Sequence, residues 1–141
     1  METKENLIYL AGLIDGEGCI YADKYALRLQ IASKDPFMIP WCYNTFKIGA
    51  IKKHWQKNGF VHTWIVSSKQ CGKLLNQLLP YLKVKYDQAY AAVILQNLRN
   101  KLKTKNYKYR SDLEVNGQFQ LIDTIKNLKH YWKGKECAYV W

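Results

Sequence analysis

Two acidic residues, Asp15 and Glu17, alternate with Gly16 and Gly18 directly after an apolar segment. The three- and four-residue spacing of apolar side chains predicts a helix over Glu5–Ile14 that Gly16 and Gly18 bring to an end, so the helix with its terminating residues covers 5–18. Acids are unfavourable at a helix C-terminus, because the helix dipole places partial negative charge there. An acidic pair at this position therefore predicts a bound cation.

Zinc is not the expected cation. The histidines lack the His-x-x-x-His spacing of a zinc site, and the cysteines are far apart with no Cys-x-x-Cys pair. These residues are His54, His62, His130, Cys19, Cys42, Cys71 and Cys137. We interpret the cysteines as reduced packing residues. Any metal must then be held by oxygen ligands, as Mg²⁺ is.

Two β-hairpins are expected on either side of a second helix. Apolar and polar residues alternate over 27–31, as in a half-buried strand of a first hairpin at about residues 19–33 that turns at 23–25. Asp35 and Pro36 predict a helix that continues to about Lys47, with Asp35 as its cap. Asn58-Gly59 predicts the turn of a second hairpin, at about residues 48–68, with strands near Ala50–Gln56 and Phe60–Ser67.

The remaining part, residues 69–141, is expected to be mainly helical. Helices are predicted over Lys69–Leu82, from Tyr86 to about Leu102, and over about Gln118–Trp132. Lys101–Arg110 is a basic segment that we interpret as a solvated loop. The apolar tail Ala138–Trp141 is expected to pack against the domain, because exposed apolar side chains would favour aggregation.

Residues 1–141 are therefore expected to form one α+β domain of order αββαββα, with a four-stranded antiparallel sheet backed by helices on one face. The other face is expected to carry Tyr21, Asp23, Arg28, Gln30, Lys52, His54, Gln56 and Thr63. Such side chains recognise donors and acceptors on base edges, and a two-stranded ribbon fits the major groove of DNA. A merely solvated face is the alternative, and a register slip of one residue would exchange the two faces.

The charge favours a polyanionic partner. The chain carries 22 Lys and Arg against 11 Asp and Glu, a net charge of +11, while 48% hydrophobic residues are enough for a folded core. No long apolar run and no secretory signal are evident, so an intracellular protein without a membrane partner is expected, in the cytoplasm or an organelle. The tryptophans Trp41, Trp55, Trp64 and Trp132 are interpreted as residues of the core or of a dimer interface, with stacking on bases as the alternative.

Leu10–Gly18 reads LAGLIDGEG and resembles the signature of the LAGLIDADG homing endonucleases. Seven of the nine positions match, and the two replacements, Gly16 and Glu17, retain a small residue and a carboxylate. The expected order of helices and hairpins is also the order that this family uses, so the resemblance covers most of the chain.

The resemblance implies a site-specific endonuclease that makes a double-strand break in a long, near-palindromic DNA target during intron homing. One copy of the motif implies a homodimer, with the two motif helices packed at a twofold axis. The expected interface residues are Ile8, Ala11, Gly12 and Asp15. The two sheets would then form a saddle over duplex DNA and cleave both strands across the minor groove.

The same resemblance implies roles for individual residues. Glu17 stands at the position of the metal-binding acid, and the backbone carbonyl of Gly16 is a second candidate ligand. Mg²⁺ is the implied cofactor, Mn²⁺ is expected to substitute, and Ca²⁺ is expected to support binding without cleavage. Lys85, in the segment 80–85, is the candidate for stabilising phosphate charge or orienting water. Asp15 is expected mainly to cap and hydrogen-bond at the helix junction, with direct catalysis as its second candidate role.

Ser33 stands where many members of the family carry a larger polar residue that contacts the catalytic water. That role is therefore open among Ser33, Lys34, Lys85 and solvent. Lys34 is also a candidate DNA contact, and Lys52, Lys53 and Lys57 are candidates for the phosphate backbone.

Two other functions remain alternatives on the same fold. One is a maturase that binds intron RNA and assists splicing, because a basic saddle suits RNA as well as DNA. The other is a catalytically inactive DNA-binding regulator, against which the retained acid Glu17 argues.

Overall fold

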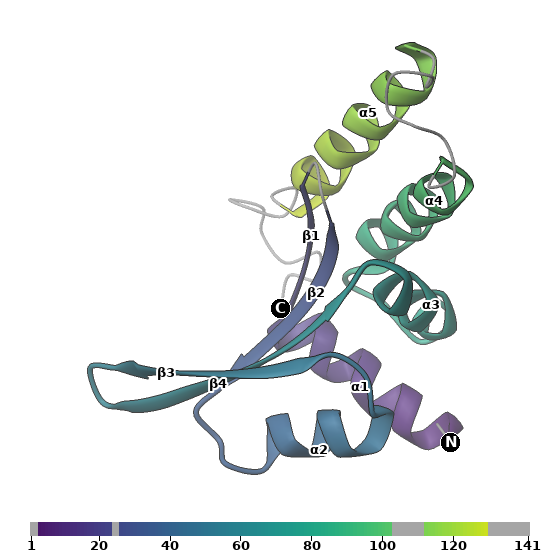
Figure 1. Cartoon of the computed structure of the whole chain (residues 1–141). Coiled ribbons are helices and arrows are strands. Elements are labelled where there is room, and N and C mark those ends of the chain that lie inside the picture. Colours follow the sequence, from purple (N-terminus) through teal and green to yellow (C-terminus); the bar gives the residue numbers. More distant parts are fainter. Residues whose placement is uncertain (1–2, 24–25, 103–111, 130–141) are drawn as a thin grey trace, which may run out of the picture.

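The computed structural model describes residues 3–23, 26–102 and 112–129 of the chain (Figure 1). Its elements follow the predicted order: α1 (Lys4–Glu17), β1 (Gly18–Ala22), β2 (Leu27–Ser33), α2 (Met38–Phe46), β3 (Ala50–Gln56), β4 (Gly59–Ser67), α3 (Ser68–Leu78), α4 (Tyr86–Leu102) and α5 (Asp112–Lys129). The predicted α+β class and the four-stranded sheet are confirmed.

The sheet has the strand order β1-β2-β4-β3, and all its neighbouring strands are antiparallel. Leu29 lies opposite Val66, and Ile31 lies opposite Trp64, so these buried side chains share one face. Gln30, one residue away in β2, lies on the other face. The period-2 pattern of the sequence therefore assigned the two faces correctly.

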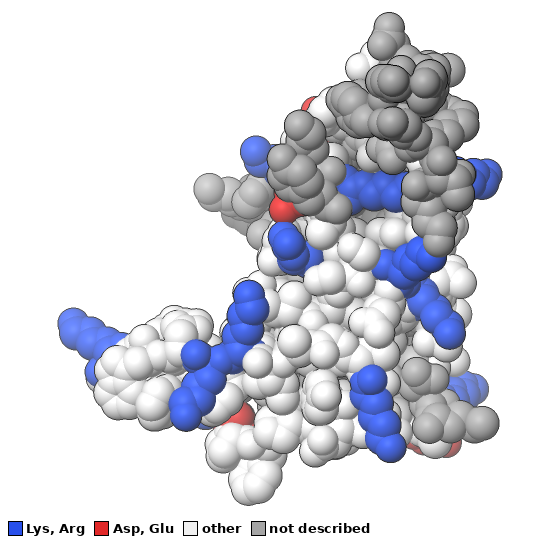
Figure 2. Space-filling model, in the orientation of Figure 1, with Lys and Arg blue, Asp and Glu red and all other residues white. Residues whose placement is uncertain are grey.

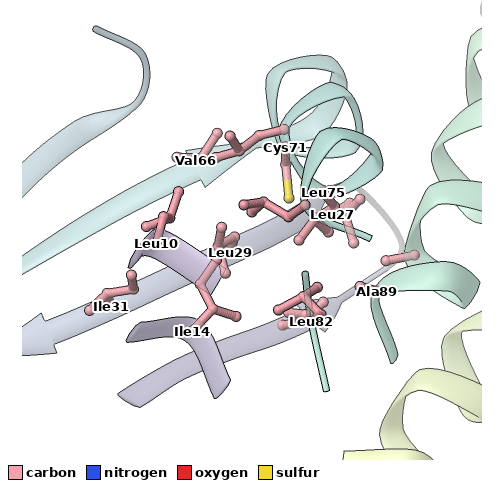
Figure 3. Packing of buried hydrophobic residues seen from close by; sticks show 14 of the residues in the cluster. Leu10, Ile14, Leu27, Leu29, Ile31, Val66, Cys71, Leu75, Leu82 and Ala89 are labelled. Atoms are coloured by element: carbon pink, nitrogen blue, oxygen red, sulfur yellow. The ribbon is translucent and has the colours of Figure 1, made fainter. Parts of the chain in front are cut away.

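The buried face of the sheet packs against helices to form the hydrophobic core (Figure 3). Leu10 and Ile14 of α1 are fully buried in this core with Leu29 and Ile31 of β2. Burying one such side chain stabilises a fold by about 1.5–3 kcal/mol. The core therefore fixes α1 against the back of the sheet, and it positions the last turn of this helix.

The first helix is longer than predicted, because it continues through Glu17 instead of ending near Ile14. The backbone N–H of Gly18 donates to the carbonyl of Ile14 at the end of the helix. A Cβ on Gly18 would lie 2.7 Å from the Cα of Ile14, so the missing side chain lets β1 leave the helix directly.

Other boundaries also differ from the predictions. The second helix begins at Met38, although Asp35 does act as a cap, since its Oδ1 accepts hydrogen bonds from the backbone N–H groups of Phe37 and Met38. The helix α3 ends at Leu78 and not at Leu82. The helix α5 begins at Asp112, six residues before the predicted start. The second hairpin pairs Gln56 with Gly59, so its loop is 57–58, one residue earlier than expected.

The tryptophans do not share one role. Trp64 is fully buried, and its Nε1 donates to the carbonyl of Ile48, so packing is confirmed for this residue. Trp41 packs against the core. Core packing is wrong for Trp55, which is 66% exposed and contacts only the exposed Phe60 among described rings, while packing in a dimer stays a prediction for this residue. This part of the β3–β4 hairpin projects beyond the helices, so no core is available to cover it (Figure 1).

Cys42 and Cys71 are buried in the core, as expected for packing residues. Burial away from water raises the pKa of each thiol to about 12, so both stay protonated at neutral pH. No helix in the described ranges is long and apolar enough to cross a membrane. The predictions for residues 103–110, Trp132, Cys137 and the tail 138–141 lie outside the described residues.

The close approach at Gly18 gives a stability prediction. Gly18→Ala is expected to lower the free energy of unfolding by about 1–3 kcal/mol, because the added methyl group must displace the backbone of α1. Gly117→Ala in α5 is the matched control, since a Cβ there meets only a side-chain carbon of Leu98 at 3.9 Å, an ordinary contact. Chemical denaturation measures both variants, and equal stability of the two would contradict the packing at Gly18.

Candidate active site and nucleic-acid interface

The last turn of α1 is tied to the segment between α3 and α4 by Asp15. Its Oδ2 accepts a hydrogen bond of 2.8 Å from the backbone N–H of Lys83, and its Oδ1 accepts one of 2.9 Å from the backbone N–H of Lys85. These residues are about seventy positions apart in the sequence. Asp15 therefore has the hydrogen-bonding role that the sequence analysis expected.

The side chain of Lys85 in turn contacts the end of α1. The Nζ of Lys85 donates to the backbone carbonyls of Ile14 and Asp15, at 2.9 Å each. No basic residue lies in the last turn of α1 itself, so Lys85 supplies positive charge to the negative end of this helix. Asp15 and Lys85 thus form a reciprocal pair of contacts, which we call the Asp15–Lys85 clamp.

Glu17 is the last residue of α1 and is exposed. Within the described part of the chain its carboxylate makes no hydrogen bond or ion pair. Gly16 beside it is also exposed, and a Cβ there would meet nothing within 4 Å. The clamp therefore neutralises the helix end through other atoms and leaves the Glu17 carboxylate available to a ligand.

One chain supplies few ligands for a metal at this position. Among the described residues, no three His, Cys, Asp or Glu side chains lie close enough together to hold an ion. The oxygen donors at the end of α1, the Glu17 carboxylate and the Gly16 carbonyl, are nevertheless of the type that Mg²⁺ prefers. A metal bound there would need oxygen ligands beyond those that the described residues bring together.

Ser33 lies at the end of β2, opposite His62. Its hydroxyl accepts a hydrogen bond of 3.0 Å from the backbone N–H of Asp35, so it is engaged in the turn before α2. Among the described residues, no hydrogen bond joins Ser33 to Glu17 or Lys85. Lys34, the next residue, is exposed.

One side of α1 is left uncovered in the isolated chain. Ile8 and Tyr9 are 47% and 57% exposed, and a Cβ on Gly12 would meet nothing within 4 Å. Ile8, Gly12 and Gly16 follow one another at four-residue spacing and so share one stripe of the helix. The interface prediction for Ala11 is wrong, because its side chain is fully buried in the core of its own chain and cannot reach a second chain.

The sheet face opposite the core is hollowed. A depression of about 660 Å³ is lined by Tyr21, Arg28, Gln30, Gly49, Ala50, Lys52, Ile65, Ser67 and Gln70. The strand register places Lys52, His54 and Gln56 on this same face. Thr63 lies there too, opposite Lys52, but it is only 6% exposed. The face thus collects the predicted nucleic-acid contacts, apart from Asp23 in the turn beyond β1 and Lys34 after β2.

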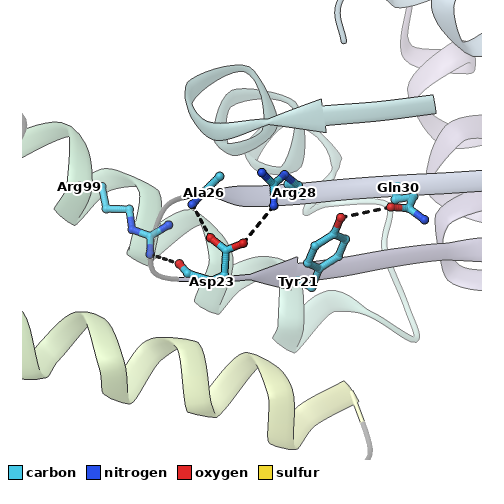
Figure 4. A network of polar contacts seen from close by, with 6 residues as sticks. All are labelled: Tyr21, Asp23, Ala26, Arg28, Gln30 and Arg99. Carbon is cyan, nitrogen blue, oxygen red and sulfur yellow. Dashed lines mark hydrogen bonds and ion pairs between the residues drawn. The ribbon is translucent and has the colours of Figure 1, made fainter. Parts of the chain in front are cut away.

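Polar contacts order the side chains at the β1–β2 end of this face (Figure 4). Asp23 forms an ion pair of 3.0 Å with Nη1 of Arg28 and accepts a 2.8 Å hydrogen bond from the backbone N–H of Ala26. The Tyr21 hydroxyl donates to Oε1 of Gln30 at 3.2 Å. These contacts hold Arg28 and Gln30 in defined orientations.

Arg99 is the residue of this network that sequence reasoning missed. From α4, its Nη2 donates to the backbone carbonyl of Asp23, and its Nε donates to Gln118 of α5. Burial lowers the pKa of the guanidinium, and the nearby carboxylate of Asp23 opposes that change. A single arginine inside a helical pattern carries no signal that it supports a turn 76 residues away.

Basic side chains predominate on the surface. In the view of Figure 2, lysines and arginines are spread over the projecting β3–β4 hairpin and the body of the domain, and few acidic side chains are visible. Residues 50–62 include Lys52, Lys53 and Lys57 but no acid. A positive hairpin next to a polar hollow suits a polyanionic partner.

Solved structures with the same architecture bind DNA. The homing endonuclease I-CvuI, in complex with its target in the presence of calcium, superposes with a TM-score of 0.73 at 19% identity, over 96% of this chain and 87% of that chain. The archaeal intron-encoded homing endonuclease I-Vdi141I, complexed with DNA, gives 0.68 at 15% identity, over 96% and 89%. The LAGLIDADG meganuclease I-AabMI, bound to uncleaved DNA, gives 0.62 at 24% identity, over 82% of this chain and 43% of that chain. The chain has the LAGLIDADG homing endonuclease fold.

No protein-family model and no curated protein sequence matches the chain. The LAGLIDADG fold is nevertheless supported by two independent features, the spatial arrangement of the elements and the Leu10–Gly18 motif. The motif occupies the second half of α1 and the first residue of β1, so it includes both the clamp and Glu17.

The clamp gives a second stability prediction. Asp15→Asn keeps the size of the side chain but turns one hydrogen-bond acceptor into a donor, which would face a backbone N–H. The free energy of unfolding is expected to fall by about 0.5–1.5 kcal/mol, the usual contribution of a hydrogen bond, because these two bonds are only partly buried or exposed. Asp123→Asn, at an exposed position of α5, is the control. Chemical denaturation that finds the two variants equally stable would show that the clamp contributes nothing.

Proposed function

We propose that the chain is a homodimeric, metal-dependent, site-specific DNA endonuclease of the homing type. The observation that carries this proposal is the end of α1, where the clamp leaves the Glu17 carboxylate exposed and without a partner among the described residues. The chemistry of such a group is ligation of a cation. The fold, shared with DNA-bound homing endonucleases, supports duplex DNA as the substrate.

The dimer is supported by the uncovered stripe of α1. Gly12 and Gly16 allow the backbone of a second helix to approach closely, and the exposed Ile8 would be buried by it. A twofold axis beside this stripe would bring two Glu17 residues near each other. The second carboxylate would then supply ligand oxygens that a single chain lacks.

In the proposed site, some groups would hold a metal ion and others would act directly on the phosphate. Glu17 and the Gly16 carbonyl would hold Mg²⁺, with the remaining ligands from the second chain, water and DNA phosphate. When bound, the ion would polarise the scissile phosphate and favour attack by hydroxide. Lys85, held at the adjacent carbonyls, would stabilise negative charge on the phosphate, and Asp15 would keep Lys85 in place.

The hollowed face of the sheet is the proposed DNA-binding surface. Its polar side chains, Arg28, Gln30, Lys52, His54 and Gln56, are of the types that contact base edges. Lysines around the hairpin, such as Lys53 and Lys57, would neutralise phosphates. Two such sheets in a dimer would cover the two halves of a near-palindromic site.

Loss of the Glu17 charge gives the first test. Glu17→Gln is expected to lower the rate of duplex cleavage by about a hundredfold or more, because the ligand charge is lost, while DNA affinity is retained. Glu5→Gln, the same change in the first turn of α1, is the control. The measurement is Mg²⁺-dependent cleavage of a duplex that the protein has selected from a randomised library, with the product ends mapped on both strands.

The outcomes separate the candidate functions. Full activity of Glu17→Gln would contradict the metal role. Tight duplex binding with no cleavage by the wild type would indicate a regulator. Preferential binding of structured intron RNA over the selected duplex would indicate a maturase.

The second test separates catalysis from binding at Lys85. Lys85→Met is expected to lower the cleavage rate at saturating protein by more than it weakens DNA binding. Lys83→Met is the matched control, because the clamp uses only the backbone N–H of Lys83. Single-turnover cleavage and equilibrium binding measure the two effects, and equal losses in both would make Lys85 a phosphate contact only.

The third test concerns assembly. The DNA-free wild type is expected to have a mass near twice 16.6 kDa by light scattering. Gly12→Arg is expected to give a folded protein of half that mass, because the arginine fits the isolated chain but blocks a second helix. A monomeric wild type, or a dimeric Gly12→Arg variant, would contradict the proposed interface.

A further inference from the structure

Two side chains in the hollow, Arg28 and Gln30, are each hydrogen-bonded by a neighbouring side chain of the β1–β2 hairpin. We propose that Tyr21 and Asp23 are positioning residues that present Gln30 and Arg28 as hydrogen-bond donors, so that the β1–β2 hairpin selects guanine at two positions of each half-site. This inference rests on the proposed DNA-binding function and adds the base preference of one hairpin.

The side-chain amide of Gln30 lies in the hollow with one end already hydrogen-bonded. A free glutamine amide recognises adenine with both ends, since Nε2 donates to N7 while Oε1 accepts from N6. Here the Tyr21 hydroxyl donates to Oε1, which fixes the rotation of the amide. Within the described part of the chain, Nε2 has no hydrogen-bond partner. One lone pair of Oε1 and the rotation of the amide are thus committed to Tyr21, which disfavours the two-ended contact with adenine. The free donor Nε2 suits the acceptors O6 and N7 of guanine.

Arg28 is restrained by its ion pair with Asp23. Oδ2 of Asp23 accepts a 3.0 Å hydrogen bond from Nη1 and restrains a guanidinium that is about one third exposed. Arginine has five N–H donors, so one bond to Asp23 leaves a pair of donors for the two acceptors of guanine. A restrained side chain also loses less conformational entropy when it binds.

Asp23 is itself held from two sides. Its Oδ1 accepts from the backbone N–H of Ala26, and its backbone carbonyl accepts from Arg99 of α4 (Figure 4). The orientation of Arg28 is thus fixed through Asp23 by contacts with helix α4 as well as by the hairpin turn. Arg28 and Gln30 are two residues apart on one strand, about 6.6 Å, which corresponds to roughly two base pairs.

The experiment is selection of duplexes from a randomised DNA library, followed by sequencing, for the wild type and two variants. Tyr21→Phe removes only the hydroxyl, and it is expected to raise the ratio of adenine to guanine about tenfold at the Gln30 position. Asp23→Asn keeps an acceptor for Ala26 but loses the charge, and it is expected to relax guanine selection at the Arg28 position. Each variant should leave the position of the other residue unchanged.

The base preferences that depend on the β3–β4 hairpin, where Lys52 and His54 lie, are the internal control and should not change. Unfolding temperatures of the variants show whether the fold is retained. Wild-type half-sites without two enriched guanines about two base pairs apart would overturn the inference, and so would folded variants with unchanged preferences. A library with no enriched sequence at all would instead contradict the proposed site-specific DNA binding.

Discussion

The Asp15–Lys85 clamp is the interaction on which the rest of the account depends. An acidic sequence at a helix C-terminus is unfavourable by itself, because the helix dipole and the free carbonyls already carry negative charge there. The ammonium group of Lys85 donates to the carbonyls of Ile14 and Asp15 in the last turn, while the Asp15 carboxylate accepts two backbone N–H groups. The clamp makes it possible for α1 to end in a second acid, Glu17, whose carboxylate stays exposed.

The hydrophobic core fixes the position of the Asp15–Lys85 clamp and of Glu17 relative to the sheet. Leu10 and Ile14 fix α1 to the back of the sheet, and Gly18 lets the chain pass from the helix directly into β1. The end of the helix that carries the proposed catalytic site is thereby connected to the first strand of the proposed DNA-binding surface without a linker. A shift of α1 relative to the sheet would change the position of Glu17 and of the β1–β2 hairpin together.

Much of this arrangement could be predicted from local pattern. The alternation of Leu27 to Ile31 and the apolar spacing of α1 depend on burial of one side, which a sequence displays directly. The faces of the sheet, the element order and the motif helix were predicted on that basis. The position of Asp15 at a helix junction also follows from its place next to two glycines.

What could not be predicted depends on contacts between distant segments or on how far the core extends. Arg99 supports Asp23 across 76 residues, and Ala11 faces inward although a small residue would suit either side of the helix. Trp55 lies on the same strand face as buried residues, but the helices do not reach it, so it is exposed. Alternation of apolar and polar residues predicts which face of the sheet a residue occupies. It does not predict whether helices cover that face at that position.

The most direct test of the central claim is to locate the metal. Crystals of the protein with a selected duplex and Mn²⁺ would reveal the ion by its anomalous scattering, whatever the rate of cleavage. The account predicts Mn²⁺ bound to the Glu17 carboxylate, between the two α1 helices of a dimer and next to a DNA phosphate. Mn²⁺ bound at another site, or two Glu17 residues far from both the ion and the DNA, would contradict it.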